Sequence, residues 1–449
     1  MAIANAQNWE IEQIDFIGAF LNSDLTDVDI YLQIPEGFSD WARSCSPTTA
    51  KILVQMGYNP KEMQVILLEK ALYGLKQGPR EWQTKLKSLL FTEGFKPLIS
   101  DPAVFYNAKS KHFIVTFVDD CLLIGPKLQY IQDLKARFNK IYALEDRGPA
   151  AYFLGVQIIR DRPNRLLWLH QSQYIEEALA TFGLADCKPI SVPLQPGVLK
   201  YSGGKPVNAL EIKLLQRIIG TLMYLMLLTR PDIGFAVQWL SRFLTKATTI
   251  HLTAAKNLLR YLAGTKSLAI CYGNRVIKAN LPPNSLIGGF KGLKLLGFSD
   301  SDFAGAREDS KSTYGYLYTL SGGPITWKCK KASTIALSTP EAETDALAEA
   351  LREAQWLKSL FTEIGLPVKG PIAIFGDNTG SIANAHNPTH HQRTKHTLLK
   401  FHYVRELVTE GLVTLKYLES KQMPADGLTK PLTLPIHKVF LELIGLKPL

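Results

Sequence analysis

The chain has 449 residues, of which 46% are hydrophobic and 20% are charged. These proportions are typical of folded globular proteins, and the length predicts two or three domains, each able to bury its own core. The net charge of +11 indicates a polyanionic partner, with nucleic acid first on the list. Five scattered cysteines argue against a disulfide framework and a zinc site, and no apolar run approaches the ~18–20 residues of a membrane span. We therefore expect an intracellular protein, cytoplasmic or nuclear, that makes no membrane contact.

Two segments of the N-terminal part carry acids at strand ends. Residues 11–20 predict a strand that delivers Asp15 near its end and then turns, and residues 112–125 predict a β-hairpin with Asp119 and Asp120 at its tip. Adjacent carboxylates between apolar strands repel each other, and a divalent metal removes that conflict. Ordinary turn chemistry explains the two hairpin acids equally well when they are taken alone. With Asp15 beside them, they would form a two-metal site for phosphoryl transfer.

The middle of the chain is expected to be helical. Apolar residues recur at helical spacing within residues 205–270, and Lys256, Arg260 and Lys266 project between them. Such a helix can pack on its core while its cations follow a duplex backbone. A solvated basic face is the alternative for each of these residues. Segments rich in proline and glycine near 189–206 and 281–292 are the expected linkers.

The C-terminal part predicts a second set of acids. The segment 295–302 predicts a strand that ends in acids, and a helix is expected to begin at Ser338, with proline in its first turn. Counting back four residues from Leu347 puts Glu343 on the apolar stripe of that helix. A carboxylate on a buried face is costly unless it binds something.

The other acids of this set follow in order along the chain. Residues 371–376 predict a strand that leads to Asp377, and Asp426 is expected in the first turn of a C-terminal helix. Asp300 is the expected acid of the 295–302 strand, and Asp302 is its alternative; strand register favours Asp300. The histidine-rich loop 386–396 has no cysteine and irregular spacing, so we expect contact with a nucleic-acid backbone or simple solvent exposure there, not zinc.

Ordered motifs extend along nearly the whole chain. They occupy residues 13–15, 19–22, 34–38, 71–77, 79–80, 82, 117–120, 152–155, 229–233 and 260–265, followed by 338–343, 393–396 and the four acids of the C-terminal part. The first group resembles the reverse transcriptase of copia-type LTR retrotransposons, and the second resembles the ribonuclease H domain carried behind it. The resemblance implies an α/β (α+β) fold: a polymerase palm (1–190), a helical thumb and connection (191–290), and a ribonuclease H-like α/β domain (291–449).

The resemblance also implies roles for the palm residues. Asp15, Asp119 and Asp120 would be its metal ligands, and Phe20 would be the aromatic gate that selects deoxynucleotides. A core phenylalanine is an equally good explanation of Phe20 from the sequence alone. The loop and helix start that pack on the nascent base pair and template would include Tyr73, Gly74, Lys76 and Arg80, with the two cations on phosphates or in solvent.

In the ribonuclease H part, Asp300, Glu343, Asp377 and Asp426 would hold two Mg²⁺ ions, for which Mn²⁺ is a substitute, and would support cleavage that leaves a 3′-hydroxyl on the RNA. The residues expected on the hybrid backbone are Arg393, Lys395 and His396. Expected partners are an RNA template, a DNA primer, an RNA–DNA hybrid and deoxynucleoside triphosphates. The sequence does not predict the oligomeric state.

One departure from the family concerns the N-terminus. In the family, a fingers region that binds the triphosphate precedes the Asp15 strand, whereas Asp15 lies close to the first residue here. We therefore expect weak or absent polymerase activity and a more active nuclease half. The alternative to an enzyme is a non-catalytic nucleic-acid-binding relic or a coopted retrotransposon protein.

Overall fold

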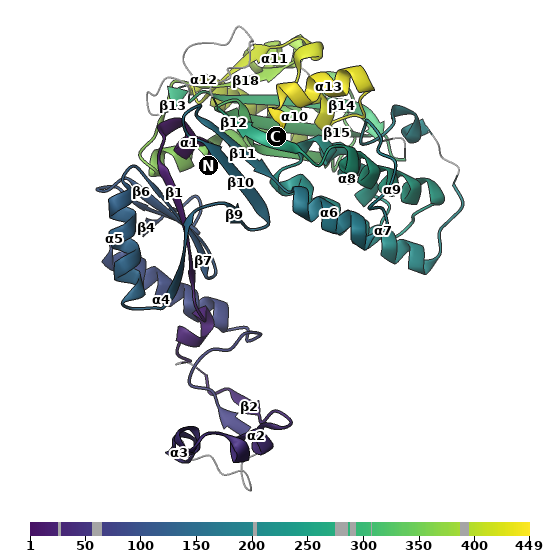
Figure 1. Ribbon diagram of the computed structural model, residues 1–449. Helices are drawn as coiled ribbons and strands as arrows, with labels where there is room; N and C mark the ends of the chain where they lie inside the picture. The colour runs from purple at the N-terminus through teal and green to yellow at the C-terminus, as the bar shows by residue number, and fades with distance from the viewer. Residues whose placement is uncertain are drawn as a thin grey trace. The chain divides into compact units, whose positions relative to one another are not determined.

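The computed structural model describes residues 1–25, 28–55, 65–200, 204–273, 286–287, 293–306, 308–386 and 395–449. The chain divides into two compact units (Figure 1). The smaller unit consists of Glu12–Pro97 and Pro102–Pro149, and the larger unit consists of Met1–Ile11, Leu98–Asp101 and Ala150–Leu449. The division into palm, thumb and connection, and nuclease domains at residues 190 and 290 stays a prediction.

The smaller unit is built on a sheet with the strand order β4-β5-β6-β7-β1-β8. Two helices share one apolar core with this sheet, since side chains from both helices and from β1, β5, β6 and β7 belong to the same buried cluster. The elements are β1 (Glu10–Phe16), β4 (Lys96–Pro97), β5 (Val104–Asn107), β6 (His112–Phe117), β7 (Asp120–Gly125), β8 (Leu144–Pro149), α4 (Gly78–Thr92) and α5 (Leu128–Asn139). The predicted hairpin is therefore confirmed as β6 and β7, which pair antiparallel.

A second group of short elements lies between β1 and α4 in the sequence. The strands β2 and β3 pair antiparallel, and α3 buries none of its residues. The elements are η1 (Ala19–Asn22), β2 (Tyr31–Gln33), α2 (Phe38–Ser44), α3 (Pro47–Gln55) and β3 (Val65–Leu67).

The helical part predicted near residues 205–270 is present in the larger unit. Its helices share one buried core, to which Leu222 of α7 and Leu258 of α9 belong. The sheet β20-β12-β11-β10-β9 belongs to the same unit. The elements are α1 (Ala2–Gln7), β9 (Tyr152–Phe153), β10 (Val156–Asp161), β11 (Leu166–His170), α6 (Ser172–Thr181), η2 (Pro196–Lys200), α7 (Ala209–Leu228), η3 (Pro231–Ile233), α8 (Gly234–Ser241), α9 (Thr249–Gly264), β12 (Leu268–Tyr272) and β20 (Leu446–Pro448).

Two of the three cations expected to project from this helical part have partners within the protein. Arg260 Nε donates to the Lys188 carbonyl over 2.8 Å, and Lys266 Nζ lies 2.8 Å from Glu176 Oε1. Contact of these residues with a duplex stays a prediction.

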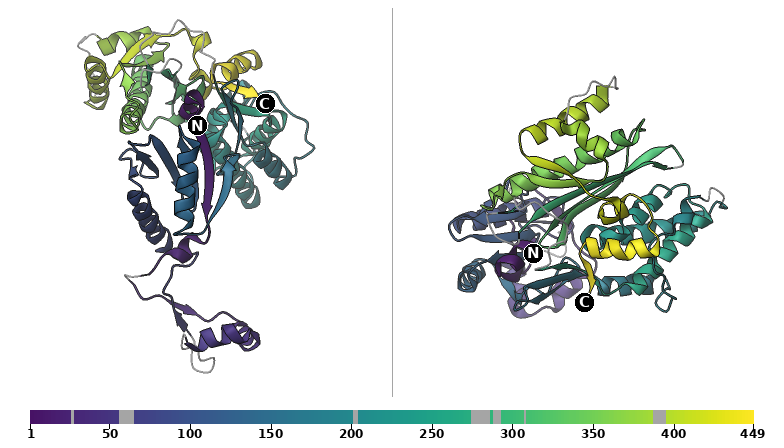
Figure 2. Two further views of the ribbon diagram at one scale, coloured as in Figure 1. Left: turned by 60° about the vertical axis from the view of Figure 1, so that its left-hand side comes forward. Right: turned by 90° about the horizontal axis from the view of Figure 1, so that it is seen from above.

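The larger unit also contains a mixed sheet with the strand order β16-β15-β14-β18-β19. β14 pairs antiparallel with β15 and parallel with β18, and the long helix α10 packs against β14 and β15 (Figure 2). The elements are β13 (Leu286–Ile287), β14 (Leu295–Ala306), β15 (Lys311–Leu320), β16 (Gly323–Lys331), α10 (Thr339–Glu363), β17 (Val368–Lys369), β18 (Ile372–Gly376), α11 (Thr379–His386), α12 (Lys395–Thr409), β19 (Val413–Tyr417), η4 (Ser420–Gln422), η5 (Asp426–Leu428) and α13 (Leu434–Leu443). The predicted mixed α/β class is confirmed.

Across the residues listed above, no helix combines the length and the apolar character that a membrane crossing requires.

Candidate active sites

The strand alternation of the smaller sheet separates its core from its acids. Ile14 and Phe16 of β1 are buried in the core shared with the helices. Because successive side chains of a strand point to opposite faces, Asp15 between them points to the other face. The Phe16 backbone N–H donates to the Asp119 carbonyl over 3.0 Å, which brings the end of β1 against the hairpin tip. The structure therefore brings Asp15 beside Asp119 and Asp120.

Two of these acids have hydrogen-bonding partners within the unit. Arg147 Nη2 lies 2.8 Å from Asp15 Oδ2, and Gln13 Nε2 donates to Asp120 Oδ1 over 2.8 Å. Burial raises the pKa of Asp15, the Arg147 guanidinium opposes that rise, and the nearby Asp119 and Asp120 add to it. Burial likewise raises the pKa of Asp120, and the Gln13 amide opposes the rise. The acids therefore sit where their charge is unfavourable without a cation.

The turn between the two strands of the hairpin is strained. Val118 has a φ of 58°, a left-handed conformation that is rare for a β-branched residue. The Trp82 indole N–H donates to the Val118 carbonyl over 2.7 Å, and Trp82 itself is buried in α4. This hydrogen bond fixes the backbone immediately before Asp119.

The residues expected to contact nucleotide and template lie close to one another in the same unit. Phe20 is only 8% exposed, and its ring centroid lies 4.7 Å from that of Tyr73. Gly74 has a φ of 100°, a turn conformation that favours glycine. Lys76 and Arg80 are exposed. The gate role of Phe20 and the phosphate contacts of the two cations stay predictions.

In the larger unit, parallel strand pairing brings two acids together. Phe298 of β14 pairs with Phe375 of β18, and their rings stack with centroids 5.4 Å apart. Asp300 and Asp377 each follow two residues later, so the two acids lie side by side, Asp300 within β14 and Asp377 directly after β18. The prediction that the 295–302 strand ends in acids was wrong, because β14 continues to Ala306. Glu343, in the second turn of α10, completes the group: one carboxylate oxygen from each of these three acids lies within 4.8 Å of the other two.

Two of these three acids are buried, and the charges of the group destabilise one another. Asp300 is 2% exposed and Glu343 is 4% exposed. Burial raises the pKa of Asp300 to about 7, with Asp426 and Asp377 adding to the rise. Burial raises the pKa of Glu343 to about 9, and Asp300 and Asp377 again add to the effect. The Thr429 hydroxyl donates to Asp300 Oδ2.

Asp426 lies beside Asp300, but the prediction of its secondary structure was wrong. The sequence predicted Asp426 in the first turn of the C-terminal helix, whereas it begins the short turn η5 and the helix α13 starts only at Leu434. Pro431 explains the difference, because proline has no backbone N–H and disfavours helical geometry in the residue before it. Lys430 Nζ lies 3.0 Å from Asp426 Oδ2.

The acids of the larger unit fit a divalent cation. Asp426 Oδ1 is buried and has no hydrogen-bond partner among the described residues. Carboxylate oxygens are the donors that Mg²⁺ and Mn²⁺ prefer, and a cation would relieve the repulsion that raises the pKa of Asp300. The fit is poorer in the smaller unit, where the described acids include no trio with ligand atoms gathered within 4.8 Å.

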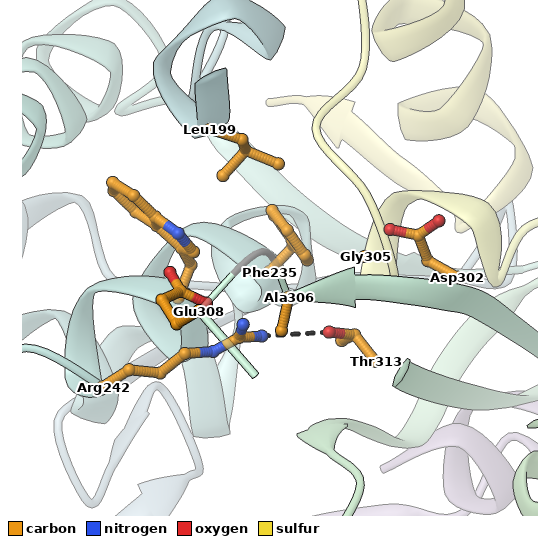
Figure 3. Close-up of a pocket in the computed structure, with 9 residues that line it drawn as sticks. Leu199, Phe235, Arg242, Asp302, Gly305, Ala306, Glu308 and Thr313 are labelled. Atoms are coloured by element: carbon orange, nitrogen blue, oxygen red, sulfur yellow. Dashed lines mark hydrogen bonds between the residues drawn. The ribbon is translucent and has the colours of Figure 1, made fainter. Parts of the chain in front are cut away.

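Asp302, the alternative to Asp300, lies outside the group of converging acids and lines a separate pocket. It is not a member of the 4.8 Å group. Its carboxylate lies over Gly305, where any side chain would collide with it. Asp302 instead lines a small pocket with Arg242 and Thr313, and Arg242 Nη2 donates to Thr313 Oγ1 over 2.9 Å (Figure 3).

The basic residues expected on the hybrid backbone are largely outside the described structure. Arg393 lies outside the described residues. Lys395 and His396 are at the start of α12, and the positions of their side chains are also not described. Their contacts with nucleic acid stay predictions.

Sequence reasoning missed four polar residues around the acids. The position of Gln13 could have been predicted, because it lies two residues before Asp15 and therefore on the same strand face. The positions of Thr429 and Lys430 could also have been predicted, because these residues lie within a turn of Asp426. No local sequence feature places Arg147 near Asp15, since the pairing of its strand with β1 depends on residues more than a hundred positions apart.

The whole chain is similar to known polyproteins. Residues 49–196 match the family model described as "Reverse transcriptase (RNA-dependent DNA polymerase)". The "Retrovirus-related Pol polyprotein from transposon TNT 1-94" of Nicotiana tabacum is 35% identical over 99% of this chain and 32% of its own length. The corresponding polyprotein from transposon RE1 of Arabidopsis thaliana is 34% identical over 99% of this chain and 28% of its own length. The chain thus spans about a third of the length of these relatives.

Among solved structures, the chain is similar to a foamy viral protease-reverse transcriptase in complex with an RNA/DNA hybrid. The TM-score is 0.47 at 13% sequence identity, and the match covers 92% of this chain and 44% of that chain.

Proposed function

Since the chain belongs to the copia-type family of retrotransposon Pol polyproteins, with a reverse transcriptase region and a ribonuclease H-like fold, we propose that it is an RNA-directed DNA polymerase and a ribonuclease of RNA–DNA hybrids. The nuclease activity is assigned to the larger unit and the polymerase activity to the smaller one. The observation that carries the proposal is the group of converging carboxylates formed by the buried Asp300 and Glu343 and the half-buried Asp377, with Asp426 beside it. Buried acids without a counter-ion are costly, and a hydrolytic metal site accounts for their presence.

In the nuclease, the chain's own residues orient the acids. Thr429 and the backbone N–H of Ser301 donate to Asp300 and Glu343, respectively, and fix the direction of their free oxygens. Paired divalent ions, when bound, would activate a water molecule and stabilise the charge on the phosphate. Lys430 supplies a further positive charge next to Asp426. The two metal ions per site, Mg²⁺ or Mn²⁺, are part of the proposal.

Cleavage of the RNA strand of a labelled RNA–DNA hybrid tests this assignment. Asp377→Asn should abolish cleavage, because it removes a carboxylate of the buried group. Asp302→Asn is the matched control, since Asp302 lies a few residues from the group on the same strand but outside it. Equal loss of cleavage in both variants would contradict the choice of Asp300 over Asp302 as the first ligand.

In the polymerase, Asp15, Asp119 and Asp120 would bind the metal ions, and Phe20 would exclude a 2′-hydroxyl. The proposal rests on the position of β1 against the hairpin tip, where Phe16 N–H donates to the Asp119 carbonyl. The weak or absent polymerase activity expected from the sequence stays a prediction. Extension of a DNA primer on a homopolymeric RNA template by the 449-residue chain measures it directly.

The partners that follow from this proposal are an RNA template, a DNA primer, their hybrid and deoxynucleoside triphosphates, in an intracellular setting. The competing proposal is a non-catalytic nucleic-acid-binding protein derived from a retrotransposon. The ion pair between Asp15 and Arg147 favours it for the smaller unit. Calorimetric titration with Mg²⁺ separates the two, since a non-catalytic relic need not bind the ion at either group of acids.

A further inference from the structure

Strand β8 carries a β-bulge beside Asp15. In its pairing with β1, Ile14 faces Asp146 and Gln13 faces Gly148, so Arg147 is an extra residue without a partner in β1. Bulges of this kind re-aim a side chain and are common next to active sites. Here the bulge directs Arg147 to the acids of the smaller unit.

The contacts of Arg147 are with carboxylates. Its Nη2 lies 2.8 Å from Asp15 Oδ2 and 3.5 Å from Glu145 Oε2. The side chain of Asp15 is 25% exposed, so part of this ion pair is shielded from water. The guanidinium also opposes the rise in the pKa of Asp120, which indicates that its charge acts on the hairpin tip. Arginine keeps its charge at every physiological pH, so this cation is permanent.

The larger unit provides a contrast. Its acids Asp300, Glu343 and Asp377 converge within 4.8 Å, and the basic residue nearby, Lys430, pairs with Asp426 outside that trio. The described acids of the smaller unit do not converge in this way, and one of them is already paired with a cation. The two units thus differ in the acid that pairs with the neighbouring basic residue: Lys430 pairs with Asp426 outside the trio, whereas Arg147 pairs with Asp15 itself.

We propose that Arg147 is a resident counter-ion of the smaller unit that competes with a divalent metal for the Asp15 carboxylate. Its guanidinium holds Asp15 in a hydrogen-bonded ion pair, so a metal ion can take Asp15 as a ligand only when that pair opens. Arg147 is thus a positioning residue that weakens metal binding and makes it more sensitive to salt. This inference rests on the proposed metal site of the polymerase, and the experiment below separates the two.

The test measures Mn²⁺ binding by the full chain, with free Mn²⁺ detected by its electron paramagnetic resonance signal. All variants carry Glu343→Gln, which weakens binding at the larger unit. Arg147→Leu should bind Mn²⁺ about three- to fivefold more tightly, because an exposed ion pair no longer has to open. Arg147→Lys, which keeps the charge, should stay close to the parent. The matched control is Arg137→Leu, which removes the same charge from an ion pair with Glu93 in the same unit and should leave the affinity unchanged.

A further variant, Asp119→Asn, shows which hypothesis fails. If it abolishes the remaining Mn²⁺ binding while Arg147→Leu leaves the affinity of the parent unchanged, the counter-ion role is wrong and the metal site stands. If Asp119→Asn does not weaken binding, the smaller unit does not hold the metal through these acids, and the proposed function of that unit fails together with the inference. If Arg137→Leu tightens binding as much as Arg147→Leu, the effect is one of net charge, and the specific role of Arg147 is refuted.

Discussion

Replacing Glu343 by glutamine should stabilise the metal-free protein at alkaline pH while weakening the response of the larger unit to Mg²⁺. In the folded chain the pKa of Glu343 is raised from 4.5 to about 9 by burial and by the charges of Asp300 and Asp377. Between these two pH values the folded state holds a proton that the unfolded state has lost. Stability therefore falls as the pH rises through this window. Glutamine has no proton to lose, so the variant escapes this cost.

The magnitude follows from the width of the window. At pH 8 the folded carboxyl is still mostly protonated. Each pH unit above 4.5 therefore lowers the free energy of unfolding of the wild type by about 1.4 kcal/mol. The sum is an upper bound of about 5 kcal/mol, and we expect a gain of ~3–5 kcal/mol for the variant in EDTA at pH 8, with little difference at pH 4.5. With Mg²⁺ the difference should shrink, because the wild type gains more from the ion than the variant does.

Hydrogen exchange of β14 and β18 is a suitable assay, since these strands carry Asp300 and lead to Asp377. Opening free energies, corrected for the intrinsic exchange rate, would be compared at pH 5 and pH 8, with EDTA and with Mg²⁺. The reasoning is refuted if the wild type and Glu343→Gln lose the same protection between these pH values, or if Mg²⁺ protects both equally.

Three further predictions concern other polar groups. Arg230→Met should destabilise the larger unit by about 3–5 kcal/mol in thermal unfolding, because it leaves the fully buried Asp232 carboxylate without its ion-pair partner. Trp82→Phe should cost about 1–3 kcal/mol in urea unfolding of the smaller unit, because the strained Val118 carbonyl loses its donor; an unchanged midpoint would contradict this. Lys430→Met should increase the affinity of the larger unit for Mg²⁺ severalfold in calorimetric titration, and a decrease would show that this lysine organises the acids instead of competing with the ion.

Much of both candidate sites could be predicted because short-range patterns determine it. The apolar runs around Asp119 and Asp120 define the hairpin, and the helical spacing from Leu347 identified Glu343 as the inward-facing acid, as its 4% exposure confirms. Strand register favoured Asp300 over Asp302, and in the structure Asp300 belongs to the buried group while Asp302 does not.

The remaining features depend on longer-range or subtler causes. The bulge that directs Arg147 exists only in the pairing of β8 with β1, and no local pattern encodes that register. The helical pattern around Asp426 extends only to the turn η5, because Pro431 disfavours helical geometry in the residue before it. Secondary-structure propensity predicts the conformation of each segment, whereas the contacts of the acids depend on which segments pack against one another.

The two units meet the same electrostatic problem under different constraints. In the larger unit, Asp300 and Glu343 are buried, and the nearby Lys430 forms its ion pair with Asp426. Burial raises the pKa of Asp300 and of Glu343, and the charges of neighbouring acids add to the rise, so protons neutralise these two carboxylates when metal is absent. In the smaller unit, Asp15 near the end of β1 instead pairs with Arg147 of the neighbouring strand β8. A metal ion must displace protons from the acids of the larger unit, whereas in the smaller unit it must displace the Arg147 guanidinium from Asp15. Metal binding should therefore respond to pH in the larger unit and to salt in the smaller one.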